Sequence, residues 1–124
     1  MSGLLAVAFG GACGALLRYG VANGVHGLLG RAFPYGTLTV NVSGCLLVGL
    51  LYVHLIERSA LAPEWRLGLL VGVLGAFTTF SSFALETLAL VEQGEPLRAL
   101  VNILASVVTC LVACWLGLQL GRSL

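Results

Sequence analysis

The sequence predicts an all-α membrane protein of four transmembrane helices. Hydrophobic residues make up 59% of its 124 residues and charged residues only 9%, whereas a soluble domain carries about a quarter charged residues. A soluble domain of this length has too much surface for its volume to hide so many apolar side chains. Crossing a bilayer takes about 20 mostly apolar residues per helix, and four segments have that length. They cover about residues 4–23, 37–56, 66–91 and 97–120.

Helix-breaking residues separate these four segments. Pro34 ends the first joint, Pro63 lies in the second, and Gly94 and Pro96 bound the third, where a proline suits the first turn of the next helix. The joints leave no room for a soluble domain, so we expect residues 1–124 to form a single transmembrane domain. The first segment has no basic region ahead of it, and we expect it to remain in the mature protein. The expected surroundings are the lipid bilayer, with no nucleic acid as a partner.

The basic residues do not indicate which way the chain crosses the membrane. The cytoplasmic side normally carries an excess of Lys and Arg, and an even number of helices places both termini on one face. Here each face receives three arginines: Arg58, Arg66 and Arg122 on the face with the termini, Arg18, Arg31 and Arg98 on the other. Either a partner or the helix order sets the orientation, or the chain inserts both ways and pairs as an antiparallel dimer about a two-fold axis in the membrane plane.

Small residues predict close helix packing. Gly10 and Gly14 lie four apart in the first segment, and Gly44 and Gly49 lie in the second; small residues allow helix backbones to approach closely in lipid. The cysteines are also small, and their spacing matches no zinc or redox motif. We therefore expect packing roles for all four: Cys13, Cys45, Cys110 and Cys114.

The densest group of polar residues lies in the middle of the third segment, within residues 75–83. Polar residues are costly in lipid and are functional hypotheses by default. Glycine close to Thr78 and Thr79 favours a break in the helix, and freed carbonyls can bind a hard cation such as sodium. Phe80 and Phe83 share a helix face, and their positive ring edges would suit a small anion. The alternative is that the rings only pack and the hydroxyls bond back to their own helix.

Other polar residues fall in the remaining three segments. Asn41 lies about one turn into the second segment, and Arg18 lies toward the far end of the first. The fourth segment carries a stripe of Asn102, Ser106 and Thr109 at spacings of four and three. Such spacings place side chains on one face of a helix, so these three residues should face the same neighbour.

Three stretches occur in a characteristic order: GGACGALLRY at residues 10–19, GTLTVN at 36–41, and GAFTTFSSFALE at 75–86. Together they resemble the Fluc/CrcB family of fluoride channels, and the resemblance extends along nearly the whole chain. Two residues depart from the family pattern. Ser82 stands where the third motif usually has Thr, which keeps the hydroxyl, and Asn102 stands where the fourth helix often has Tyr. Ser106 matches the family pattern better, and Thr109 and Cys110 are both candidates for the next position of that polar stripe.

The resemblance implies an antiparallel, dual-topology homodimer in the cell membrane, with two pores that pass fluoride passively and thereby give fluoride resistance. It implies no enzymatic activity. On this basis Phe80 and Phe83 would line each pore with their ring edges. Asn41 would donate its amide to the anion, and hydroxyls near the path would come from Ser81, Ser82 and Ser106.

The resemblance also implies roles beside the pore. Arg18 would draw anions toward a vestibule or pin helix ends, and Glu86 would be an interhelical partner near the pore. The backbone carbonyls of Gly75 and Thr78 would bind a structural sodium ion at the centre of the dimer. The third helix would be broken near its middle to free those carbonyls.

A small proton-coupled multidrug or cation exporter with four helices is the alternative. Such exporters rely on a carboxylate in the first helix, whereas Arg18 is the only charged residue of this first helix and Glu86 is the one deep carboxylate. A non-conducting assembly subunit would not need the group of hydroxyls and Phe rings. An enzyme is not expected, because the chain has no Asp and no nucleophile–base arrangement.

Overall fold

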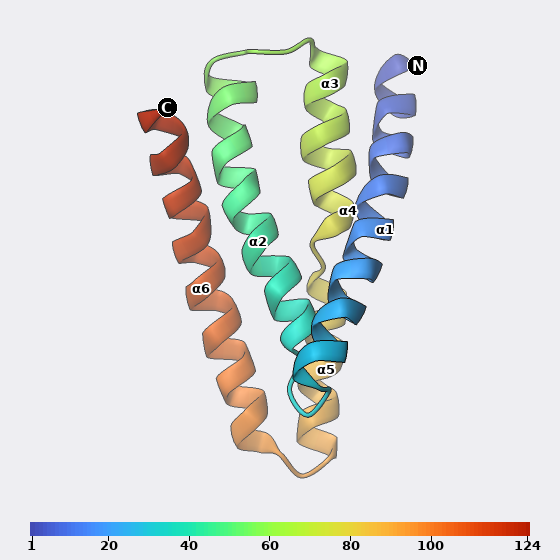
Figure 1. Cartoon of the computed structure of the whole chain (residues 1–124), viewed down its shortest axis with the longest axis vertical. Helices are drawn as coiled ribbons and strands as arrows, with labels where there is room; N and C mark the ends of the chain where they lie inside the picture. Colours follow the sequence, from blue (N-terminus) through green and yellow to red (C-terminus); the bar gives the residue numbers. More distant parts are fainter.

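The computed structural model describes all 124 residues, and its regular secondary structure is entirely helical (Figure 1). Four helical spans are long and apolar enough to cross a membrane: Ser2–Leu29, Tyr35–Glu57, Pro63–Glu92 and Pro96–Ser123. The prediction of an all-α, multi-pass membrane protein with four helical spans is confirmed.

The first and last spans are each one continuous helix, whereas the middle two are composite. Helix α1 covers Ser2–Leu29 and helix α6 covers Pro96–Ser123. The second span consists of α2, Tyr35–Tyr52, and a π-helical turn η1, Val53–Glu57. The third span consists of α3, Pro63–Leu67, the π-helical η2, Gly68–Leu74, the short α4, Gly75–Phe77, and α5, Phe80–Glu92.

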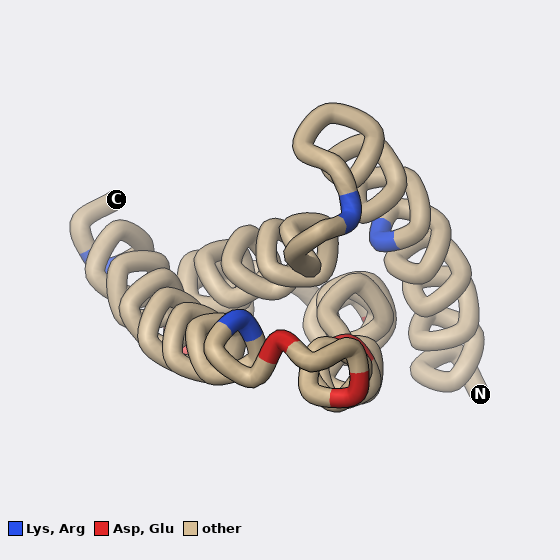
Figure 2. The backbone as a smooth tube through the Cα atoms, turned by 90° about the horizontal axis from the view of Figure 1, so that it is seen from below, with Lys and Arg blue, Asp and Glu red and all other residues tan.

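Both termini lie at the same end of the bundle as the connection between η1 and α3 (Figure 1). The other two connections lie at the opposite end, and most charged residues lie near helix ends (Figure 2). At the end with the termini, the Arg122 guanidinium is 2.8 Å from the Glu57 carboxylate. At the opposite end, Arg98 donates to the Ala32 carbonyl at 3.4 Å. Polar contacts therefore link distant parts of the chain at both ends of the bundle.

Helix α1 is longer than its sequence predicts. It continues through Gly24 and Gly27 to Leu29 and ends at Gly30, whose φ of 83° lies in the left-handed region. Glycine weakens a helix in water, but backbone groups without access to water must pair internally, which favours the helix.

Two pairs of glycines bring the helices close together. A Cβ added at Gly10 would strike the Gly68 carbonyl of η2, and one at Gly14 would strike the Val73 carbonyl. Likewise a Cβ at Gly49 of α2 would strike the Cys114 carbonyl of α6, and one at Gly117 would strike the Leu46 carbonyl. Contact between backbones replaces contact between side chains at both crossings, as small residues permit in membrane bundles.

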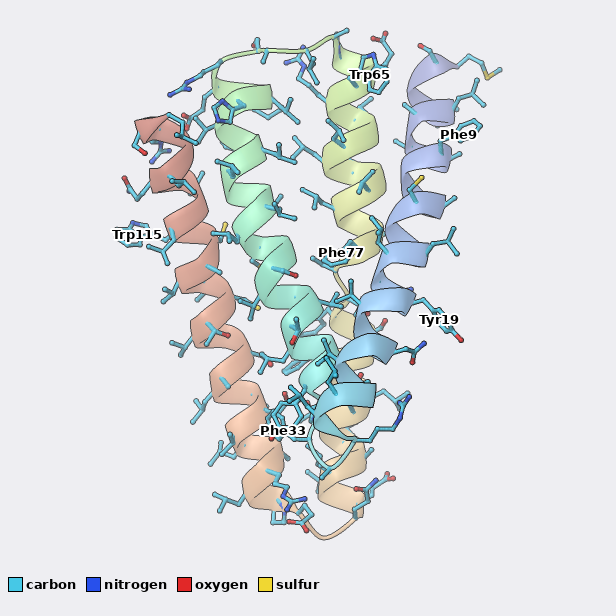
Figure 3. All side chains as sticks on the ribbon, in the orientation of Figure 1. Phe9, Tyr19, Phe33, Trp65, Phe77 and Trp115 are labelled. Carbon is cyan, nitrogen blue, oxygen red and sulfur yellow. The ribbon has the colours of Figure 1, made fainter.

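The outer surface of the bundle is apolar. Phe9 and Tyr19 project outward from α1, and Trp115 projects outward from α6 (Figure 3). The exposed fraction of these side chains is 74% for Phe9 and 57% for Trp115. Such exposure suits a surface whose solvent is lipid, because apolar side chains lose nothing by facing acyl chains.

The crossing of α2 and α6 provides a stability test. Gly117→Ala places a methyl group against the Leu46 carbonyl, so we expect a loss of about 1–3 kcal/mol in the free energy of unfolding, as for other overpacked sites. The measurement is the unfolding transition in detergent. The matched control is Gly24→Ala in α1, where the added Cβ meets nothing within 4 Å; it should unfold no earlier than the parent protein. Equal stability of both variants would contradict the close crossing.

Candidate functional site

The helix of the third span is interrupted at Thr78 and Thr79. Helix α4 ends at Phe77, and both threonines have extended backbone, with φ and ψ of −82° and 157° at Thr78 and −151° and 119° at Thr79. Helix α5 then begins at Phe80, and the Thr79 hydroxyl caps it by accepting from the Ser82 amide at 3.2 Å. Threonine is a favoured N-cap residue, so the local sequence supports a new helix start at this depth.

Asn41 of α2 satisfies the backbone at this point. Its side-chain amide donates to the Thr79 carbonyl at 2.9 Å, and its side-chain oxygen accepts from the Thr79 amide at 2.8 Å. An asparagine side chain has two N–H donors, so one N–H of Asn41 remains after these two bonds. Asn41 therefore holds the extended segment and keeps a donor for another group.

A cavity of about 350 Å³ lies beside this pair of hydrogen bonds. Four of the predicted pore residues line it together: Asn41, Phe80, Phe83 and Ser106. The Phe80 and Phe83 rings lie 5.4 Å apart between centroids, at an interplanar angle of 46°. The wall thus combines aromatic rings with an amide and hydroxyls, because the predicted residues of α2, α5 and α6 converge here.

A chain of buried hydrogen bonds ties α5 to α6 next to this cavity. The Asn102 amide donates to the Thr87 hydroxyl at 2.9 Å, and that hydroxyl donates to the Phe83 carbonyl at 2.6 Å. The Ser106 hydroxyl lies 3.3 Å from the Asn102 side-chain oxygen. Asn102 is only 1% exposed, and a buried amide is stabilising when its partners are present. The stripe predicted on the fourth helix therefore places Asn102 and Ser106, but not the exposed Thr109, against α5.

A second cavity of about 280 Å³ contains the other charged candidates. Arg18, Ser82 and Glu86 line it together with Thr37, whose hydroxyl donates to the Glu86 carboxylate at 2.5 Å. Thr79 lines both cavities. The two hydrogen bonds between Asn41 and Thr79 therefore lie where the aromatic cavity and the charged cavity approach each other.

Two predicted residues lie outside both cavities. Ser81 is exposed, with its hydroxyl 3.3 Å from that of Thr79. Gly75 is also exposed. The amide four residues after Gly75 belongs to Thr79 and bonds to Asn41, so the Gly75 carbonyl has lost its usual helical donor. An unpaired carbonyl is suited to a hard cation, whereas no group of three or more His, Cys, Asp or Glu side chains forms a metal site.

Several residues at or beside these cavities are not among the predicted site residues. Thr37 precedes Asn41 by four residues and therefore shares its helix face. This spacing is the sequence signal that indicates Thr37 as a site residue. Thr87 and Thr79 fit the hydroxyl-rich pattern of the third span. Cys45 and Cys110 line the first cavity, and no local motif indicates that they meet, because they belong to helices far apart in the sequence.

Comparison with known proteins agrees with this architecture. Residues 5–118 match the family described as CrcB-like protein, Camphor Resistance (CrcB). The chain is 59% identical to the protein named "Fluoride-specific ion channel FluC" of Methylococcus capsulatus over 98% of its own length, although it spans only 53% of that relative. It is 49% identical over the full length of both chains to the protein of the same name from Geobacter sulfurreducens. The protein of that name from Coxiella burnetii is 45% identical over 98% of both chains.

The family match covers nearly the whole chain, and the relatives span all four helices. The predicted family resemblance is confirmed: the chain belongs to the CrcB-like family.

Proposed function

We propose that this protein is a fluoride channel that passes the anion passively through the cavity beside Asn41. The relatives that carry the name of a fluoride-specific ion channel include one that matches this chain from end to end. The observation that carries the proposal is the convergence of Asn41, Phe80 and Phe83 on one cavity at the interruption of the third span. A channel is not an enzyme, and no catalytic group is required.

Hydrogen-bond donors without fixed charge suit the passage of fluoride. The ion is small and strongly hydrated, so it must receive donors as it loses water, while conduction requires that it also leave. Asn41 retains one N–H after its two bonds to Thr79. The Ser106 hydroxyl contacts Asn102 at 3.3 Å, a long bond, so little is lost when it turns toward an anion.

The two Phe rings provide a second type of contact. Ring edges carry partial positive charge, so an anion that moves along the edges of Phe80 and Phe83 is attracted without binding tightly. Phe83 is partly buried, whereas Phe80 is 79% exposed in the single chain. A pore wall has to be closed on all sides, so we propose that a second copy of the chain covers Phe80.

An antiparallel homodimer supplies that second copy. Three arginines on each membrane face give no preferred orientation, which permits insertion in both directions. A two-fold axis in the membrane plane then pairs the two orientations and creates two equivalent pores. The dimer would lie in the inner or plasma membrane of the cell.

We further propose that a structural sodium ion binds at the centre of this dimer. The Gly75 carbonyl has lost its helical donor and the Thr78 backbone is extended, so both carbonyls are available as ligands. A two-fold copy would add the same pair and give four oxygen ligands. Bound sodium would supply positive charge that holds together the two interrupted spans.

The charged cavity would serve as the entrance. Arg18 attracts anions toward it, and the bond between Thr37 and Glu86 keeps the one deep carboxylate engaged. Export needs no energy source beyond the membrane, because an inside-negative potential favours anion exit by about 2.3 kcal/mol per charge per 100 mV. Removal of cytoplasmic fluoride in this way would give resistance to its toxicity.

Release from proteoliposomes tests the channel directly. We expect vesicles loaded with fluoride to release it when valinomycin and a potassium gradient set the potential, without any proton gradient, while chloride is retained. A fluoride electrode records the release. If release occurs only with a proton gradient, the proton-coupled exporter becomes the better explanation.

Replacement of the aromatic rings tests the site. Phe80→Ile and Phe83→Ile keep an apolar side chain but remove the ring edge, so each should abolish fluoride release. Size-exclusion chromatography should show the same oligomer as the parent. Phe9→Ile, at an exposed position of α1, is the matched control and should conduct normally. Normal release by both Phe80 and Phe83 variants would remove these rings from the pore.

Reporter fusions at the C-terminus test dual insertion. A fluorescent reporter that matures only in the cytoplasm and a phosphatase that is active only outside it should both give signal, each on part of the population. Ser123→Lys adds positive charge to one face and should shift the balance toward the fluorescent reporter. A signal from only one reporter on the parent chain would contradict the antiparallel arrangement.

A further inference from the structure

Two cysteines share the first cavity with the proposed pore residues. Cys45 of α2 and Cys110 of α6 both line its wall, together with Asn41, Phe80 and Phe83. Both thiols are free. Fluoride conduction does not require sulfur, because a thiol is only a weak hydrogen-bond donor.

The close crossing of α2 and α6 makes these thiols neighbours. Gly49 packs on the backbone at Cys114, and Cys45 and Cys110 each lie one turn before these contacts, on the same helix faces. Cys45 and Cys110 accordingly lie near each other on the wall of the first cavity. The pair is thus held together by the helix packing and does not depend on a flexible loop.

We propose that Cys45 and Cys110 form a two-coordinate site for a soft divalent cation, with Hg²⁺ as the representative ion. Thiolates are the ligands that soft metals prefer, and two sulfurs complete the linear coordination of Hg²⁺. Each thiol loses its proton to the solvent and forms one Hg–S bond. The reaction releases two protons per ion and involves no oxidation or reduction.

Charge favours a divalent ion at this depth. Two thiolates and Hg²⁺ form a neutral centre, whereas two thiolates and a soft monovalent ion such as Ag⁺ would leave one negative charge in the bilayer, where charge is costly. Zinc would need about four ligands, and no group of three or more metal-binding side chains is present. The pair therefore favours a divalent ion that accepts linear, two-coordinate binding.

Bound mercury would lie in the cavity beside Asn41 and Phe83. It would narrow the path that we propose for fluoride, so the second consequence of the site is metal-dependent block. This consequence, unlike binding itself, rests on the proposed function.

Metal uptake tests the site independently of conduction. The full-length protein with Cys13→Ser and Cys114→Ser keeps only the pair, and its purified detergent-solubilised form is titrated with Hg²⁺ in the presence of glutathione as a competing thiol. We expect one Hg²⁺ per chain, two sulfur ligands by X-ray absorption, and loss of both thiols to a thiol reagent. Removal of Hg²⁺ from the pair should need on the order of a hundredfold more glutathione than removal from a chain with one thiol, since the second Hg–S bond is intramolecular.

Single-thiol chains and a displaced pair provide the controls. When Cys45→Ser or Cys110→Ser is added to the chain that already carries Cys13→Ser and Cys114→Ser, mercury should bind weakly, through one protein sulfur. If a hydroxyl at the helix contact impairs folding, the corresponding Cys→Ala variants repeat the comparison. A variant that keeps Cys13 and Cys110 has two thiols on different helices and should bind as two single sites. Equal retention of mercury by the pair and by one thiol, or uptake of two ions by the pair, would overturn the proposal.

Fluoride release with and without Hg²⁺ separates the two claims. Glutathione is present at a concentration that removes mercury from single thiols. Under this condition, vesicles that contain the pair variant should stop releasing fluoride after mercury is added. Vesicles with the Cys45→Ser variant should release it at the same rate before and after. If the pair takes up mercury but fluoride release is undiminished, the proposed block is wrong and the metal site is still supported. If the pair variant releases no fluoride even without mercury, the proposed function fails, and the uptake experiment still decides whether the site exists.

Discussion

The two hydrogen bonds between Asn41 and Thr79 are the interaction on which the rest of the site depends. Inside a bilayer no water is available to an unpaired backbone N–H or C=O, and each unpaired group is costly. The extended backbone at Thr78 and Thr79 interrupts the helical ladder, and one side chain of a neighbouring span supplies both a donor and an acceptor to Thr79. The first cavity and the new start of α5 both lie beside these two hydrogen bonds.

Further contacts position the helices that surround these two hydrogen bonds. Phe80 and Phe83 of α5 line one cavity with residues of α2 and α6. The bonds from Asn102 through Thr87 to the Phe83 carbonyl tie α5 to α6 beside it. The glycine contacts at Gly49 and Gly117 bring α2 and α6 together behind the cavity. Rigid walls matter for a pore that distinguishes a small anion from a larger one, because a flexible wall would adapt to either.

The two cavities differ in the charged groups that line them. The charged cavity has Arg18 and Glu86, whereas the aromatic cavity has no ionisable group except its two thiols. In the proposed channel, attraction at the charged cavity would raise the local concentration of anions, and a neutral passage along the aromatic cavity would avoid a tightly held ion. The neighbouring thiols introduce a different chemistry into that passage, with a preference for soft metals that oxygen and nitrogen donors lack.

The sequence by itself determined the four helices and the composition of the site. Apolar length predicts a membrane span from local composition alone, and hydroxyls, amide and rings within lipid indicate function wherever they meet. Only the tertiary structure decided which of them meet. It joined Asn41 to Thr79, gathered Phe83 and Ser106 in one cavity, placed Ser81 and Gly75 outside it, and brought Cys45 to Cys110. These outcomes depend on the depth and rotation of each helix, which the close glycine contacts set between residues far apart in the chain.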